Sequence, residues 1–193
     1  MTGGSKKMHS KYGSFILASF FAGLTAVGAF LRIPFPVVPV TLQVLIVLLS
    51  GFLIGPKPAF MAQAAYILLG LAGAPVFTGG GGISYILSPT FGYLFSYMPA
   101  SWLVGKIARS GEPSVSLYSM AALAGLAVIY LLGASVLYIN LNYLAGKPVT
   151  LLYTVQIGIY PFIVPDLLKG AAAVLFALKI RRHGWGKEPG TQQ

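Results

Sequence analysis

The stretch LYSMAALAGLAVIYLLGASVLYINL, from Leu117 to Leu141, carries no charged side chain along its whole length. A helix needs about 20 predominantly apolar residues to cross the roughly 30 Å hydrocarbon core of a bilayer. This stretch is long enough and apolar enough to do so. It therefore predicts a transmembrane helix and indicates an integral membrane protein.

The composition of the whole chain agrees with this prediction. Of its 193 residues, 56% are hydrophobic and 8% are charged, which is typical of a membrane protein. We predict an all-α, polytopic fold in a single integral-membrane domain over residues 1–193, with a six-helix bundle at 15–180 and basic tails at 1–14 and 181–193. The six predicted transmembrane helices are Phe15–Leu31, Thr41–Gly55, Ala59–Gly73, Phe91–Ala108, Leu117–Leu141 and Val155–Ile180.

The basic residues predict the orientation of these helices. Thirteen Lys and Arg against three Asp and Glu would suggest a nucleic-acid partner for a soluble protein. Here ten of the thirteen lie in the tails or in two short connections, and Lys and Arg are enriched in cytoplasmic segments. With both termini in the cytoplasm, only Arg32 and Lys147 fall in outer loops, while Lys169 lies within a span. We therefore expect cytoplasmic N and C termini, a lipid bilayer around the bundle and no nucleic-acid partner.

Two of the predicted spans are too short to cross the bilayer fully. Thr41–Gly55 and Ala59–Gly73 have about 15 residues each, or roughly 22 Å of helix. They flank connections rich in helix-breaking residues, Ile33–Val40 with three prolines and Ala74–Thr90 with four consecutive glycines. Non-helical backbone at membrane depth is tolerated where protein surrounds it or where it lines a cavity. We therefore predict a pocket in the outer half. The proline-rich loop is either a hinged lid over this pocket, which is our hypothesis, or a passive spacer.

Asp166 and Lys169 are the strongest candidates for ligand contact. Asp166 is the only acidic residue within a predicted span, and Lys169 follows at i+3 on the same helix face. Each charge costs about 2.5–3.5 kcal/mol at the middle of a membrane helix. An ion pair that only neutralises itself is the alternative. We favour ligand contact because both residues lie at the depth of the predicted pocket, just after Pro161 and Pro165, which we expect to interrupt the last span.

Other polar and small residues lie near the same pocket, each with a structural alternative. Arg32 can attract an anion or anchor the membrane interface, and Gln43 can bind a ligand or a neighbouring helix. Tyrosines at this depth can also belong to the interfacial aromatic belt. Glycine lets backbone N–H groups approach a ligand closely, but a glycine run can equally be a flexible loop. The candidate tyrosines are Tyr85 and Tyr93, and the candidate glycines are Gly80 and Gly81.

The first predicted span carries small residues at every fourth position, namely Ala18, Ala22 and Ala26. Small residues at this spacing let a second helix approach closely. The partner helix can belong to another protein or to the same bundle, and the spacing alone leaves both open.

Several kinds of chemistry have no candidate residues in this chain. It has no cysteine, its two histidines, His9 and His183, are in the tails, and it has no phosphate-binding loop of the type G-x-x-x-x-G-K-[ST]. We therefore predict no metal site, no cofactor, no nucleotide hydrolysis by this chain and no enzymatic activity.

Four stretches together resemble the BioY family, the biotin-binding S components of energy-coupling factor (ECF) transporters. They are Thr25–Gln43, the turn Ile54–Pro56, Tyr66–Leu94 and Pro161–Lys169. The resemblance implies the six-helix S-component fold in a bacterial or archaeal cell membrane. It also implies high-affinity capture of biotin, with a transmembrane coupling protein and a pair of ATPases as partners.

The resemblance also implies roles for individual residues. The Asp-x-x-Lys of the family's last helix matches Asp166 and Lys169, and its glutamine after the first loop matches Gln43. Its coupling-protein contacts on the first helix match Ala18 and Ala22. Two alternative functions stay open, namely an S component for another vitamin and a self-sufficient proton-coupled carrier.

Overall fold

The computed structural model describes residues 3–34 and 37–182, with side chains from residue 12 onward. The fold is mainly helical, as predicted. Outside the described residues lie Pro36 and the predicted carboxyl-terminal tail from His183 on. The side chains of the amino-terminal basic residues are not described either. The elements are α1 (Gly3–Phe30), β1 (Arg32–Ile33), β2 (Val40–Thr41), α2 (Gln43–Ile54), α3 (Pro56–Leu71), the 3-10 helix η1 (Ile83–Leu87), α4 (Phe91–Ile107), α5 (Val115–Ile139), the π-helix η2 (Asn140–Leu144), α6 (Leu151–Gly158) and α7 (Tyr160–Arg182).

Among the described residues, three helices are long and apolar enough to cross a membrane: Tyr12–Phe30, Val115–Leu144 and Tyr160–Arg182. The helices α2 and α3 have 12 and 16 residues. At 1.5 Å per residue they measure about 18 and 24 Å, shorter than the hydrocarbon core. The prediction of two short helices is therefore confirmed, while the count of six membrane crossings stays a prediction.

The structure differs from the predicted helix boundaries at four points. Helix α1 begins at Gly3, so most of the predicted tail at 1–14 is helical. The predicted last span is two helices, because the chain breaks at Ile159 before Pro161, which has no N–H for the helical hydrogen bond. Pro165 was expected to interrupt the span, but it lies inside α7. The connection Ala74–Thr90, predicted to be non-helical, contains η1.

Helix α2 lies at the centre of the bundle. It contacts α1, α3, α4 and α7, and nine of its 12 residues are buried. Large apolar side chains such as Leu131, Leu168 and Leu175 are exposed on the outer helices. Apolar side chains on both the inner and the outer helix faces are typical of a bundle surrounded by lipid.

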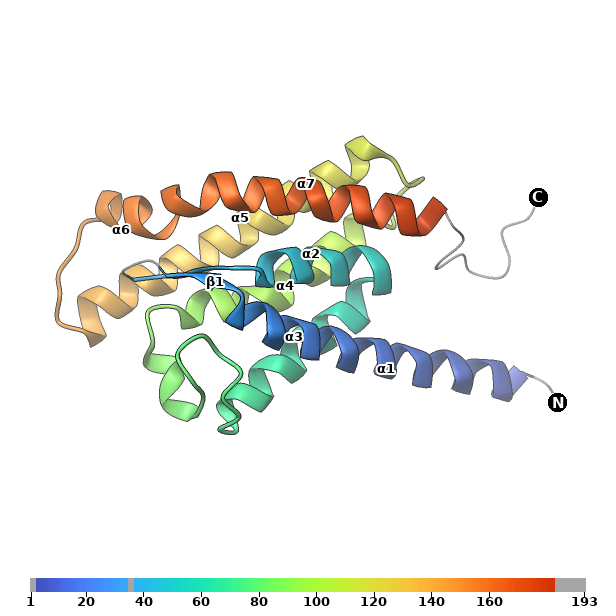
Figure 1. Cartoon of the computed structure of the whole chain (residues 1–193), viewed down its shortest axis with the longest axis horizontal. Helices are drawn as coiled ribbons and strands as arrows, with labels where there is room; N and C mark the ends of the chain where they lie inside the picture. The colour runs from blue at the N-terminus through green and yellow to red at the C-terminus, as the bar shows by residue number, and fades with distance from the viewer. Residues whose placement is uncertain (1–2, 35–36, 183–193) are drawn as a thin grey trace.

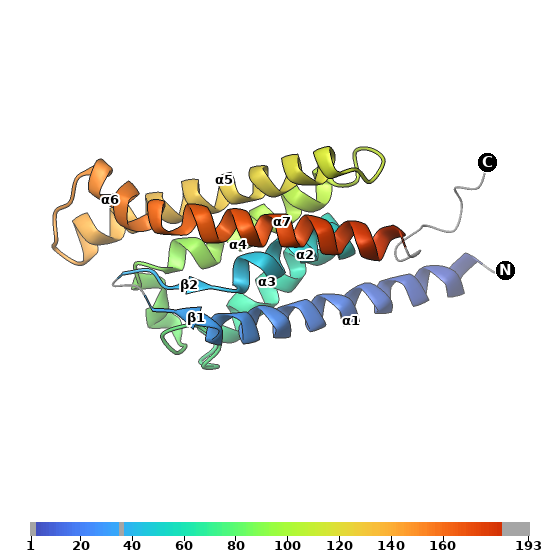
Figure 2. The same ribbon diagram turned by 45° about the horizontal axis from the view of Figure 1, so that its top comes forward.

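The two ends of the molecule differ in structure. Helix α1 begins and α7 ends at the same end (Figure 1). At the opposite end lie α6, the hairpin of β1 and β2, and the loop with η1 (Figures 1 and 2). In the hairpin, Arg32 pairs with Thr41 and Ile33 with Val40 in antiparallel register. The non-helical connections therefore gather at the end away from the termini.

A tight turn joins α2 to α3 and packs against α4. Gly55 forms this turn with φ of +83°, a conformation that L side chains rarely adopt. A Cβ at Gly105 would lie 2.6 Å from the Pro56 backbone nitrogen and 2.7 Å from the Gly55 carbonyl carbon. Since both are backbone atoms, neither can rotate away. Gly105 is therefore required for the close approach of α4 to this turn.

We expect Gly105→Ala to destabilise the bundle by about 1–3 kcal/mol, the usual cost of overpacking a well-packed core. The matched control is Gly23→Ala on α1, where a Cβ would meet nothing within 4 Å. Alanine is about 1 kcal/mol better than glycine in a helix interior, so this variant should be neutral or stabilised. Thermal unfolding of the detergent-solubilised proteins measures both changes, and equal midpoints for the two variants would contradict the packing argument.

Candidate ligand-binding site

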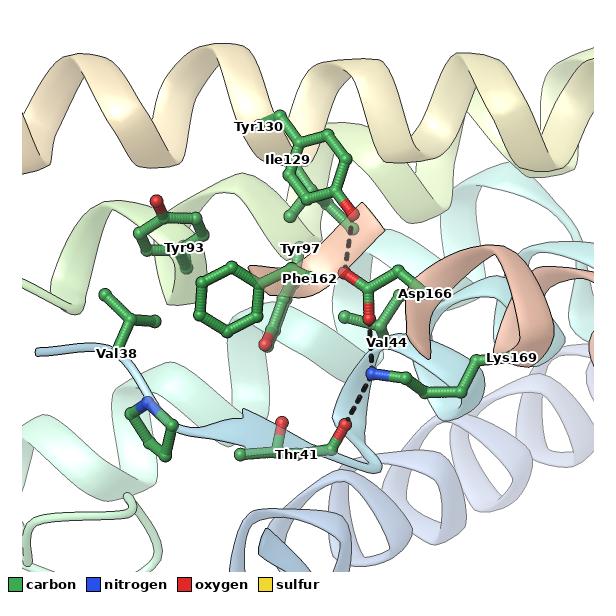
Figure 3. A pocket seen from close by; sticks show the side chains of 11 residues that line it. Val38, Thr41, Val44, Tyr93, Tyr97, Ile129, Tyr130, Phe162, Asp166 and Lys169 are labelled. Atoms are coloured by element: carbon green, nitrogen blue, oxygen red, sulfur yellow. Dashed lines mark hydrogen bonds and ion pairs between the residues drawn. The ribbon is translucent and has the colours of Figure 1, made fainter. Parts of the chain in front are cut away.

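A pocket lies between the hairpin and helices α2, α4, α5 and α7. Its cavity volume is about 30 Å³, room for no more than about two water molecules at roughly 10–15 Å³ each. Its walls are mainly aliphatic and aromatic, with the charged pair on α7 at one side (Figure 3). The lining residues are Val38, Pro39, Thr41, Val44, Tyr93, Tyr97, Ile129, Tyr130, Phe162, Asp166 and Lys169.

Asp166 and Lys169 form an ion pair at this pocket. The Lys169 ammonium contacts Oδ1 of Asp166, and the Tyr130 hydroxyl donates to Oδ2 at 2.9 Å. Lys169 also donates to the carbonyl oxygen of Thr41, at 2.9 Å. Figure 3 shows Asp166 between Tyr130 and Lys169, facing the hairpin. The pair therefore connects α7 to α5 on one side and to strand β2 on the other.

Both charged groups keep capacity for a further hydrogen bond. The side chains of Asp166 and Lys169 are 3% and 12% exposed. An ammonium has three N–H donors and a carboxylate about four acceptor positions. In the part of the chain that the structure describes, Lys169 uses two donors, on Asp166 and Thr41. One N–H of Lys169 and further lone pairs of Asp166 are left for a polar ligand in a poorly hydrated, largely apolar pocket.

Of the eight predicted ligand contacts, Asp166, Lys169 and Tyr93 line this pocket. The Tyr93 hydroxyl donates to the carbonyl of Gly158 at 2.7 Å, so Tyr93 contributes mainly its aromatic ring to the pocket wall. The predicted contacts that lie outside its lining are Arg32, Gln43, Tyr85, Gly80 and Gly81.

Three of these residues, Arg32, Gln43 and Tyr85, belong to a neighbouring polar network. The Gln43 amide donates to the Tyr66 hydroxyl at 2.8 Å, and Tyr66 donates to the carbonyl of Val76 at 3.2 Å. Arg32 donates to the carbonyl of Thr78, and the hydroxyls of Thr78 and Tyr85 lie 3.1 Å apart. The network joins the loop after α3 to α2 and to the hairpin, and ligand contact by Arg32, Gln43 or Tyr85 stays a prediction.

The glycines of this loop serve backbone packing. Gly80 has φ of +115° and pairs with Phe77 in a short bridge. A Cβ at Gly81 would lie 2.1 Å from the carbonyl oxygen of Ala74. Both positions therefore need glycine for the fold of the loop itself, whatever contact with a ligand they also make.

Several pocket residues were not predicted from the sequence. Tyr97, Tyr130 and Phe162 come from three different helices, and nothing in the local sequence of any one helix shows that it faces the others. The Tyr130 hydroxyl did offer a signal, because it lies in the middle of a 25-residue apolar run where a polar group needs a partner. Asp166 is that partner.

Comparison with known proteins decides the family. The model of the BioY family matches residues 5–184. The chain belongs to the BioY family. A BioY relative from Lysinibacillus sphaericus, described as a probable biotin transporter, is 40% identical over 168 residues, 86% of each chain. The biotin transporter BioY of Thermotoga maritima is 37% identical over 168 residues, 86% of this chain and 95% of the relative.

A solved structure shows the same fold. The crystal structure of the S-component for biotin from an ECF-type ABC transporter superposes with a TM-score of 0.77, covering 96% of this chain and 97% of that chain at 24% identity. The predicted S-component fold is thus confirmed for this BioY protein.

The small-residue face of α1 in this BioY chain packs inside its own bundle. Ala18 and Ala22 are 5% and 4% exposed, and Ala26 is half-buried against the same core. In the chain as described, these alanines therefore pack against helices of the same bundle. Contact of this helix face with the coupling protein stays a prediction.

Proposed function

We propose that this chain is a biotin-binding subunit of an ECF-type transporter, without enzymatic activity of its own. The observation that carries the proposal is the buried Asp166–Lys169 pair on the wall of an otherwise mainly apolar pocket. The relatives named as biotin transporters and the fold shared with a biotin S-component support it. In this role the partners are a transmembrane coupling protein and a pair of ATPases that supply the energy.

The chemistry of biotin suits such a pocket. Biotin carries a ureido ring with two N–H donors and one carbonyl, an apolar thiophane ring and chain, and a carboxylate. Asp166 can accept from the ureido N–H groups, and the remaining N–H of Lys169 can donate to a carbonyl or carboxylate oxygen. The aromatic and aliphatic walls can pack against the rings and the chain. Because the cavity holds only about 30 Å³, the hairpin has to move outward before biotin enters.

In the proposed orientation, the chain crosses a bacterial or archaeal cell membrane six times with both termini in the cytoplasm. An even number of crossings is supported by the position of the start of α1 and the end of α7 at one end of the bundle (Figure 1). The basic residues Lys179, Arg181 and Arg182 in the last turn of α7 favour the cytoplasmic side for that end. The pocket and the hairpin then face outward.

The test is a direct binding measurement on the purified chain. We expect a Kd for biotin below about 1 µM, corresponding to roughly −8 kcal/mol, and at least about 100-fold weaker binding of thiamine and riboflavin. Tight binding of another vitamin without binding of biotin would contradict the proposal in favour of a different S component.

Uptake into proteoliposomes separates the transporter subunit from a self-sufficient carrier. We expect biotin accumulation only when a coupling protein and an ATPase pair are co-reconstituted with ATP. Accumulation driven by a proton gradient in the chain alone would favour the carrier.

A further inference from the structure

Another cavity lies at the same end of the bundle, under the loop that joins η2 to α6. Its volume is about 560 Å³, compared with about 30 Å³ for the pocket at Asp166. We call it the outer groove. The residues that line it are Val37, Leu141, Lys147, Pro148, Val149, Thr150, Tyr153 and Ile157.

The loop over the outer groove is held in one conformation by specific contacts. Gly146 adopts φ of +61°, and the N–H of Lys147 bonds the carbonyl of Leu141 at 2.9 Å. The Asn142 amide holds Val149 at two points, donating to its carbonyl at 3.2 Å and accepting from its N–H at 3.1 Å. Thr150 then caps α6 by accepting from the N–H of Tyr153 at 3.2 Å. These contacts therefore hold the wall of the groove in a defined conformation.

The outer groove adjoins the inner pocket. Val37 lines the groove, and its neighbour Val38 lines the pocket. On the other side, Ile157 lines the groove, while the next residue, Gly158, accepts the hydrogen bond from Tyr93 of the pocket wall. The first loop and the Tyr93–Gly158 contact thus form the partition between the two spaces.

The chemistry of the outer groove selects a particular class of ligand. Lys147 is the one charged residue among the described residues that line it, and the other linings are aliphatic, aromatic or uncharged. An apolar molecule with a single carboxylate can place its apolar part on Leu141 and Ile157 while its anionic end pairs with the ammonium. Lys147 is exposed, so such a pair adds little affinity but accelerates encounter.

We propose that the outer groove is a capture site for an apolar carboxylate such as biotin, which Lys147 attracts before the ligand passes the partition into the inner pocket. This inference rests on the proposed function. It adds a residue that sets the rate of association and that makes no contact with the ligand in its final position.

The experiment measures association rates by stopped flow on the full-length chain in nanodiscs. In Lys147→Gln, the association rate constant for biotin should fall by about 3- to 10-fold, within the range of electrostatic steering. Its dependence on salt should weaken as well. The association rate constant for biotin amide, which lacks the carboxylate charge, should stay unchanged. The dissociation rate constant of biotin should fall by about the same factor as its association rate constant, because a residue without contact to the finally bound ligand leaves Kd nearly unchanged.

The matched control is Lys57→Gln, the same change at an exposed lysine at the start of α3. This variant should associate with biotin at the wild-type rate. A second variant, Ile157→Trp, fills the groove and should slow biotin and biotin amide alike.

An association rate for biotin that is the same in Lys147→Gln and wild type would overturn the capture site alone. A wild-type chain that binds no biotin would instead contradict the proposed function, and the capture of biotin with it.

Discussion

Replacing Asp166 with asparagine should weaken biotin binding by at least about 30-fold, since removing one partner of a buried, hydrogen-bonded charge pair costs about 2–5 kcal/mol. The substitution preserves the size of the side chain, but it removes the negative charge that neutralises Lys169 and replaces one carboxylate oxygen with a donor. A ureido N–H that approaches from the pocket then meets a weaker acceptor. Titration calorimetry on the purified variant gives the change in Kd.

The control for this variant is Glu112→Gln, the same chemical change at an exposed acid between α4 and α5. Its affinity for biotin should equal that of the wild type. Tyr130→Phe removes only the hydroxyl that donates to Oδ2 and should cause a smaller loss, of about 0.5–3 kcal/mol. A folded Asp166→Asn protein with wild-type affinity would count against ligand contact by this carboxylate.

The double variant Asp166→Asn, Lys169→Met should separate ligand contact from a purely structural ion pair. Breaking a buried pair by removing one partner costs about 3–5 kcal/mol of stability because it leaves an unpaired buried charge, whereas the double variant leaves no charge at this place. We therefore expect Asp166→Asn alone to lower the thermal midpoint and the double variant to regain it. Biotin binding should stay at least about 30-fold weaker in the double variant, as in the single one.

Stability and affinity thus separate in this series: both fall in Asp166→Asn, and only stability recovers in the double variant. A structural ion pair predicts that both recover together when Lys169 is also replaced. Recovery of biotin binding in the double variant would therefore disprove the ligand role. Thermal unfolding and calorimetry on the same preparations provide the two readouts.

Local features of the sequence predicted most of the fold. The run Leu117–Leu141 gave α5, and the short apolar segments gave α2 and α3, because burial in lipid makes hydrophobic length a strong signal. The spacing of Asp166 and Lys169 placed both on one face of α7, since residues at i and i+3 are neighbours on a helix.

Features that depend on contacts between distant segments could not be predicted. The pairing of Tyr130 with Asp166 joins residues 36 positions apart, and it follows from how α5 packs on α7. The burial of Ala18 and Ala22 depends on which way α1 faces, which a repeat of small residues does not specify. The break at Ile159 comes two residues before Pro161, while Pro165 continues the helix, and the sequence pattern alone does not distinguish the two prolines.

The hydrogen bond from Lys169 to the carbonyl of Thr41 joins the charged pair to the proline-rich hairpin. Any ligand oxygen that competes for that ammonium loosens the attachment of β2 to α7, so filling the cavity and releasing the hairpin become coupled equilibria. Coupling of this kind is reciprocal. A substitution that stabilises the attachment of the hairpin to α7 would therefore lower the affinity for such a ligand. Substitutions in the hairpin at the membrane surface would then change ligand affinity without contacting the ligand.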